Sequence, residues 1–154
     1  REILLYYIHE WKNTGNLPYD LPLPIPILGS DGKITKERYW FQRGWFQENF
    51  KHEDSISVMR ITDNSLATYG FCRGDIVIAS RLPEHMLFRT QYVYMLQERD
   101  GGIYPRVSDL SSVKNDESNR ILKSSIDPND QISFAPLPTG VVMIGRIVWK
   151  SSLL

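Results

Sequence analysis

The stretch Ile61-Thr-Asp-Asn-Ser-Leu66 is followed, nine residues after Ser65, by Gly74-Asp75-Ile-Val-Ile-Ala79. The first stretch ends an apolar run in a polar turn that contains a serine, and the second begins a new apolar run with a Gly-Asp turn. Asp, Asn and Ser hold such turns by hydrogen bonds from their side chains to the backbone. We therefore predict that Gly74 adopts a backbone angle that a β-carbon resists, with the strand 76–79 beneath the serine turn.

Short apolar runs separated by turn residues continue from this point in both directions. They give seven candidate strands, at residues 56–62, 75–80, 91–97, 103–107, 120–124, 132–134 and 141–150. Arg99-Asp-Gly-Gly102 predicts a hairpin between two of them, because glycine supplies the positive backbone angles of tight turns. Residues 108–119 are rich in Ser, Asp and Asn and predict an exposed loop. This pattern is typical of a mostly β domain, compact or half-barrel in form.

The N-terminal part has a different pattern. Apolar residues at spacings of three and four predict a short helix over residues 1–13, ended by Thr14-Gly15-Asn16. Four prolines in residues 17–26 then predict a linker, or an extended strap across the domain, in place of regular structure. We expect residues 1–20 to be a helix and linker that continue a longer protein, and residues 21–154 to be the domain.

Aromatic residues are concentrated between Tyr39 and Phe46, around Arg43 and Gly44. Because aromatic side chains bury the largest area per residue, we expect them to close one end of the β-sheet. A groove for a ligand or a peptide is the alternative.

The composition limits the classes of function. The 154 residues are 42% hydrophobic, enough for one core, and 18 basic residues balance 18 acidic ones. A domain that grips DNA by its phosphates would carry a basic excess. Cys72 is the single cysteine and is expected to be a small buried hydrophobe, and no histidine has metal-ligand spacing. We expect a cytoplasmic protein without membrane contact, metal or cofactor.

The order and spacing of several motifs resemble the LexA, UmuD and phage lambda-type repressor family, whose usual pattern is V-x-G-D-S-M-x-P followed by G-D-x-V. Phe41-Gln-Arg-Gly-Trp-Phe46 is similar to the segment that precedes the family's serine. Residues 119–129 resemble its L-x-L-x-S-D-N-P segment, and residues 142–149 its last strand, I-I-G-R-V-V-W. The resemblance covers about residues 24–149 and implies a LexA-like C-terminal domain fold.

The family cleaves itself with a serine that a neutral lysine activates. The resemblance places Ser65 at the nucleophile position and Pro105 at the position of the lysine, so the general base is lost. Arg106 cannot replace it, because a guanidinium stays protonated. Asp63 stands where the family has glycine and would oppose negative charge at an oxyanion site. The Ala-Gly or Cys-Gly bond that the family cuts is also absent.

The resemblance therefore implies a C-terminal dimerisation and regulatory domain of a phage-repressor-like transcriptional regulator, without self-cleavage. Operator DNA would be bound through an N-terminal helix-turn-helix outside this chain, and a regulatory protein partner is possible. One alternative is an active autoprotease in which Lys114 or Lys123 activates Ser65. A second is a sensor that binds a peptide or ligand in the vacated cleft. We expect a homodimer paired through an edge strand at residues 141–150, which are apolar on both faces. The alternative is an internal strand whose second face is covered by the aromatic segment of residues 39–46.

Overall fold

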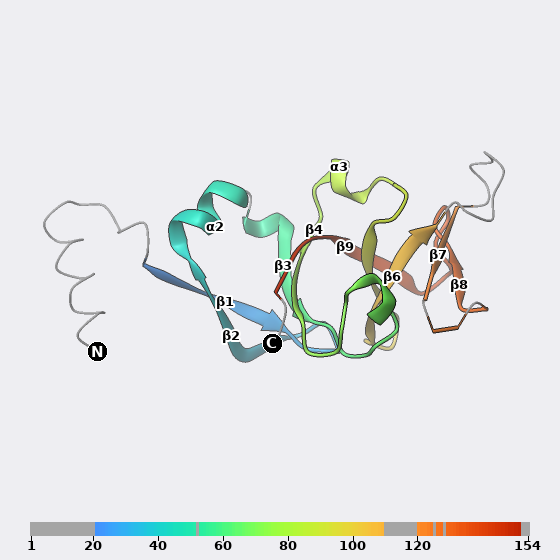
Figure 1. Cartoon of the computed structure of the whole chain (residues 1–154), viewed down its shortest axis with the longest axis horizontal. Coiled ribbons are helices and arrows are strands. Elements are labelled where there is room, and N and C mark those ends of the chain that lie inside the picture. The colour runs from blue at the N-terminus through green and yellow to red at the C-terminus, as the bar shows by residue number, and fades with distance from the viewer. Residues whose placement is uncertain (1–20, 52, 110–119, 125, 128, 152–154) are drawn as a thin grey trace, which may run out of the picture.

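The computed structural model describes residues 21–51, 53–109, 120–124, 126–127 and 129–151. Within these ranges one nine-stranded sheet has the order β2-β1-β3-β4-β9-β5-β6-β7-β8, drawn in Figure 1. Its strands are β1 (Pro22–Leu28), β2 (Ile34–Gln42), β3 (Ile56–Arg60), β4 (Ile76–Ser80), β5 (Val93–Glu98), β6 (Ile103–Asp109), β7 (Ile121–Lys123), β8 (Gln131–Ser133) and β9 (Val141–Lys150). The helical elements are α2 (Arg43–Asn49), α3 (Pro83–Met86) and two 3₁₀ turns, Glu53–Ser55 and Ala67–Tyr69. The prediction of a mostly β domain is confirmed.

The seven predicted strands are all present, with ends that differ by a few residues. The hairpin predicted at residues 99–102 joins β5 to β6, and Gly101 in it has a φ of 100°. The predicted N-terminal helix lies outside the described residues, as do residues 110–119 of the predicted loop. Ser108 and Asp109 were assigned to that loop wrongly, because both belong to β6 and pair with β7. Ser108 is buried, and its hydroxyl donates to the Arg89 carbonyl and accepts from the Tyr92 amide.

The proline-rich segment forms a regular strand where a linker or strap was predicted, over residues 22–26. Pro22, Pro24 and Pro26 occupy alternate positions of β1. Because alternate residues of a strand direct their amide groups to the same side, the prolines remove donors from one edge only. Leu23 and Ile25 keep their N–H groups for the antiparallel ladder with β2. β1 meets β3 in parallel only beyond the prolines, at Ile27 and Leu28.

The C-terminal strand β9 lies inside the sheet, between β4 and β5. Our prediction that it is an edge strand available for dimerisation is therefore wrong. Most of its apolar residues pack within the domain. Trp149 packs against Tyr39, Phe41 and Trp45, and Ile147 packs against the core cluster that contains Val77, whereas Val142 remains 61% exposed. The expectation that the aromatic segment closes one end of the sheet is confirmed, since Phe41 and Phe46 are buried in the same core cluster.

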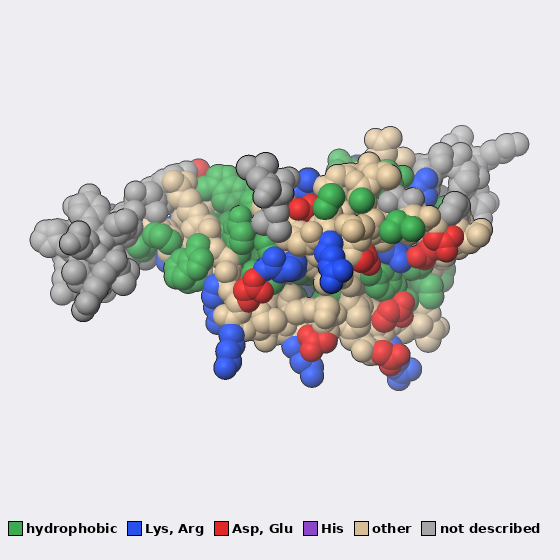
Figure 2. All heavy atoms as spheres, turned by 60° about the horizontal axis from the view of Figure 1, so that its bottom comes forward, with side chains coloured by type: hydrophobic (Ala, Val, Ile, Leu, Met, Phe, Trp, Pro, Cys, Tyr) green, Lys and Arg blue, Asp and Glu red, His purple; other side chains and the backbone are tan. Residues whose placement is uncertain are grey.

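Charged side chains are dispersed over the face of the molecule shown in Figure 2. Lys and Arg side chains lie beside Asp and Glu side chains along this face, and they do not form a continuous cationic stripe there. This distribution agrees with the formal net charge of zero. Phosphate-backbone binding by this face therefore has no electrostatic basis.

Candidate functional site

Ser65 lies in a turn between β3 and β4 that side chains tie to the backbone. The Ser65 N–H donates to Asp63 Oδ1 at 2.9 Å, and the Arg73 N–H donates to Asn64 Oδ1 at 3.0 Å. The Ser124 hydroxyl donates to the Ser65 carbonyl at 3.2 Å, which joins the turn to the residue after β7. The predicted turn, held by side-chain hydrogen bonds to the backbone, is confirmed.

The Gly-Asp pair sets the entry into β4 as the sequence predicted. Gly74 has a φ of 96°, in the left-handed region that favours glycine. Asp75 is buried, and its Oδ2 accepts the Cys72 N–H at 2.9 Å. Cys72 itself is exposed, so the expectation of a buried cysteine is wrong; its backbone belongs to the turn, and its side chain points outward.

Arg106 of β6 is the cation that the structure brings to Ser65. Its Nη1 lies 3.4 Å from Ser65 Oγ and donates to the Pro105 carbonyl at 2.7 Å. Its Nη2 forms an ion pair with Asp130 Oδ2 at 2.6 Å. The guanidinium also lies 4.7 Å from the centre of the Tyr104 ring. Ser65 is 7% exposed and the Arg106 side chain 11%, so the group stands largely out of water.

Pro105 pairs with Met95 of β5 and is buried. Because successive side chains of a strand point to opposite faces, Pro105 and Arg106 face opposite ways, and Arg106 is the one on the Ser65 side. Lys114 lies outside the described residues. Lys123 is half-buried at the end of β7, paired with Val107.

The chemistry of this arrangement favours a structural role. A guanidinium stays protonated, so Arg106 donates to Ser65 Oγ and cannot accept its proton. Oxyanion holes of serine hydrolases use backbone N–H donors, commonly including that of the nucleophile. Here the Ser65 N–H is already bound to the Asp63 carboxylate. The carboxylate and the arginine together hold the serine turn.

Tyr104 completes the cluster. Burial, together with a hydrogen bond of 2.9 Å from its hydroxyl to Glu98 Oε1, raises the pKa of Tyr104 to about 12. The neutral phenol therefore persists through the neutral range and donates to the carboxylate. Arg106 stacks on the ring face and opposes this rise in pKa as the smaller effect.

Sequence reasoning missed Asp130 and Ser124 as neighbours of the serine turn. Asp130 is 24 positions from Arg106, and Ser124 is 59 positions from Ser65. Both stand next to Ser, Asp or Asn residues that are common in loops, so no local pattern marks them. Their role follows from the antiparallel path of β6, β7 and β8.

Comparison of this chain with protein-family models and with curated protein sequences finds no match. Within the described ranges, no helix has the length and apolar character needed to cross a bilayer.

Proposed function

We propose that this domain is the C-terminal dimerisation and regulatory domain of a cytoplasmic, phage-repressor-like transcriptional regulator, with a LexA-like fold and without self-cleavage. The observation that carries the loss of cleavage is the position of Arg106, between Ser65 Oγ and Asp130. Operator binding would belong to an N-terminal helix-turn-helix, and the present domain would pair the two copies.

Three features of the serine turn favour this proposal over the active autoprotease. The cation that contacts Ser65 Oγ at 3.4 Å is the Arg106 guanidinium, which is not a base. The Ser65 N–H is occupied by Asp63. The family's scissile dipeptide is missing from the sequence. Each feature bears on a different requirement of acyl transfer: the base, the oxyanion donor or the substrate.

The cleavage test uses alkaline pH, where a lysine base would be most active. We expect the chain to stay intact at about pH 10 over a day, as followed by intact mass spectrometry. Ser65→Ala is the control for contaminating protease, and Lys123→Ala tests the one described lysine that the sequence analysis considered as a base. Fragments that vanish in Ser65→Ala would establish the autoprotease and refute the proposal, and their loss in Lys123→Ala as well would identify Lys123 as the base.

Dimerisation through β9 is excluded by its internal position, so the proposal relies on another edge. β2 ends the described sheet and has nine residues, whereas β8 at the opposite end has three. Trp40 of β2 is 63% exposed, and Ile34 at the start of the same strand is 72% exposed. A long edge strand with exposed apolar residues can pair with its copy about a two-fold axis.

The dimer test compares two substitutions of similar exposure. We expect the wild-type chain to have a dimer mass in light scattering at micromolar concentration, and Trp40→Lys to have a monomer mass. Val142→Lys is the matched control, since Val142 is 61% exposed but lies on the internal strand β9. A wild-type monomer, or a dimer that survives Trp40→Lys and is lost in Val142→Lys, would contradict this interface.

A further inference from the structure

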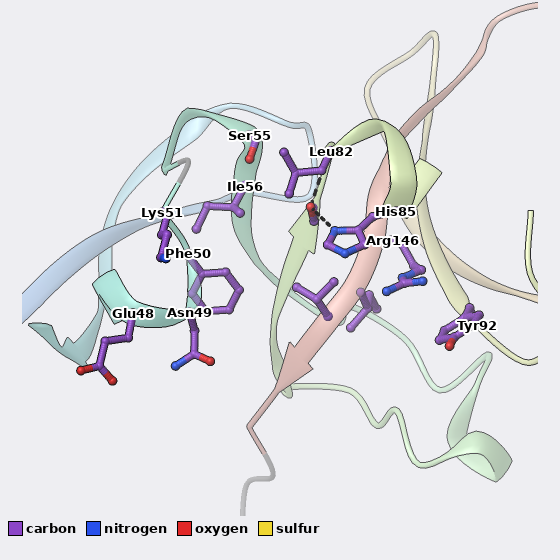
Figure 3. A pocket seen from close by; sticks show the side chains of 13 residues that line it. Glu48, Asn49, Phe50, Lys51, Ser55, Ile56, Leu82, His85, Tyr92 and Arg146 are labelled. Atoms are coloured by element: carbon purple, nitrogen blue, oxygen red, sulfur yellow. Dashed lines mark hydrogen bonds between the residues drawn. The ribbon is translucent and has the colours of Figure 1, made fainter. Parts of the chain in front are cut away.

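A cavity of about 610 Å³ lies between α2, α3 and β9, apart from the serine turn. Figure 3 shows its two walls: Glu48, Asn49 and Lys51 at the end of α2, and His85, Tyr92 and Arg146 opposite. Neither Ser65 nor Arg106 lines it. Its volume is within the range of about 300–1,000 Å³ typical of small-molecule sites.

Arg146 is the main polar feature of the cavity. Its guanidinium lies 4.3 Å from the centre of the Tyr92 ring, which fixes the plane of the group. Its Nε is buried and has no hydrogen-bond partner among the described residues. The ion pairs found in the same part of the chain do not include it. The terminal nitrogens of a partly buried guanidinium outside these ion pairs are suited to a carboxylate or phosphate, which can accept two parallel hydrogen bonds.

Further polar groups lie close to this arginine. The His85 ring approaches the buried Ser80 hydroxyl, with 2.8 Å between Nδ1 and Oγ, which leaves Nε2 outside that contact. Lys51 adds a positive charge to the wall across the cavity, where Glu48 is the one acidic lining residue. Because the charges of Lys51 and Glu48 offset each other on that wall, the excess positive charge of the cavity is that of Arg146.

Apart from Ser55, the rest of the lining is apolar. The side chains that provide it are Phe50, Ile56, Leu82, Ile147 and Val148. The body of a bound molecule would thus contact apolar side chains, and one end would contact the Arg146 guanidinium. In small-molecule sites, apolar contacts provide most of the affinity, and a few polar groups fix the orientation of the ligand.

We propose that this cavity binds a small organic anion, with a carboxylate or phosphate group on Arg146 and an apolar body against Phe50 and Ile147. This site is separate from the serine turn and does not depend on the proposed repressor function. Ligand binding here would act on β9 and α3, which together form the floor and one wall of the cavity.

The experiment uses phenylacetate and phenyl phosphate as probes, with neutral phenylacetamide as the uncharged control, followed by ¹H–¹⁵N NMR at neutral pH. We expect saturable shifts of the amides of residues 145–148 and of the Arg146 Nε–H, with millimolar or tighter affinity for at least one anion. The preferred probe distinguishes a carboxylate ligand from a phosphate ligand. Phenylacetamide is expected to bind at least about tenfold more weakly, because it cannot form the charge-assisted hydrogen bond with Arg146.

Variants separate the site from general anion binding. Arg146→Gln is expected to weaken the preferred probe at least about tenfold, while Arg99→Gln, an exposed arginine of the β5–β6 hairpin, leaves its affinity unchanged. Ser65→Ala is also expected to have no effect, which keeps the result independent of the repressor proposal. Should Arg146→Gln not fold, Tyr92→Leu provides the second test of the same wall. Absence of saturable shifts, equal binding of phenylacetamide, or shifts centred away from residues 145–148 would overturn the proposal.

Discussion

Removing the ion pair beneath the serine turn should cost more stability than a surface ion pair, and the structure gives the size of the effect. The Arg106 side chain is 11% exposed and its partner Asp130 is 35% exposed. Breaking a fully buried pair costs about 3–5 kcal/mol, whereas exposed pairs contribute about 0.2–1 kcal/mol. For this half-buried pair, Asp130→Asn should lower the free energy of unfolding by about 1.5–3 kcal/mol, since it leaves the guanidinium buried without its charge partner.

The pair is measured by a double-mutant cycle in urea at neutral pH, with Arg106→Met, Asp130→Asn and the double variant. Arg106→Met should cost about 1–2 kcal/mol, because Asp130 retains contact with water. The double variant should lose less than the sum of the single losses, with a coupling of about 1 kcal/mol.

The control cycle uses Arg60 and Glu37, an ion pair that is 37% and 54% exposed, and its coupling should stay below about 0.5 kcal/mol. Equal coupling energies in the two cycles would refute the reasoning that burial strengthens the Arg106–Asp130 ion pair. Strictly additive losses of stability at Arg106 and Asp130 would also refute it.

Two further predictions concern the sheet and the cluster beside the serine turn. A β-carbon at Gly145 would lie 2.4 Å from the Ser80 carbonyl oxygen, so Gly145→Ala should lower the free energy of unfolding by about 1–3 kcal/mol in urea. Gly102→Ala, where a β-carbon meets nothing within 4 Å, is the control, and equal losses would contradict the clash. Tyr104 has a pKa of about 12 in the folded state against an ordinary 10.0, so the unfolded state releases its proton first as pH rises. Stability should therefore fall between these two values in wild type relative to Tyr104→Phe, and parallel stability curves for the two proteins across that window would rule out the shift.

The strands that follow residue 55 could be predicted because their signal is local. Apolar runs bounded by Gly, Asp and Asn specify where a strand begins and ends, whatever its partner. The serine turn and the positive φ of Gly74 were predictable for the same reason, since both depend on residues next to each other in the chain.

β1 could not be predicted by the same rules. Proline in a sequence argues against a strand because it lacks a backbone N–H. The prolines are tolerated in β1 because their positions lie on the edge that does not donate N–H groups to β2, and only the pairing with β2 shows which edge that is. The position of β9 raised a similar difficulty. An apolar pattern on both faces is compatible with an edge or an interior strand, and the choice depends on its non-local pairing with β4 and β5.

At the candidate site, the sequence alone determined that Ser65 stands in a polar turn and that the strand at residues 103–107 contains no lysine. Only the tertiary structure decided that Arg106 contacts Ser65 and that Asp130 holds Arg106 in place. The physical reason is that these residues are far apart along the chain. The alternation of side chains along a strand predicts that Pro105 and Arg106 face opposite ways. Which of the two faces meets the serine turn is set by the antiparallel pairing of β6, β7 and β8.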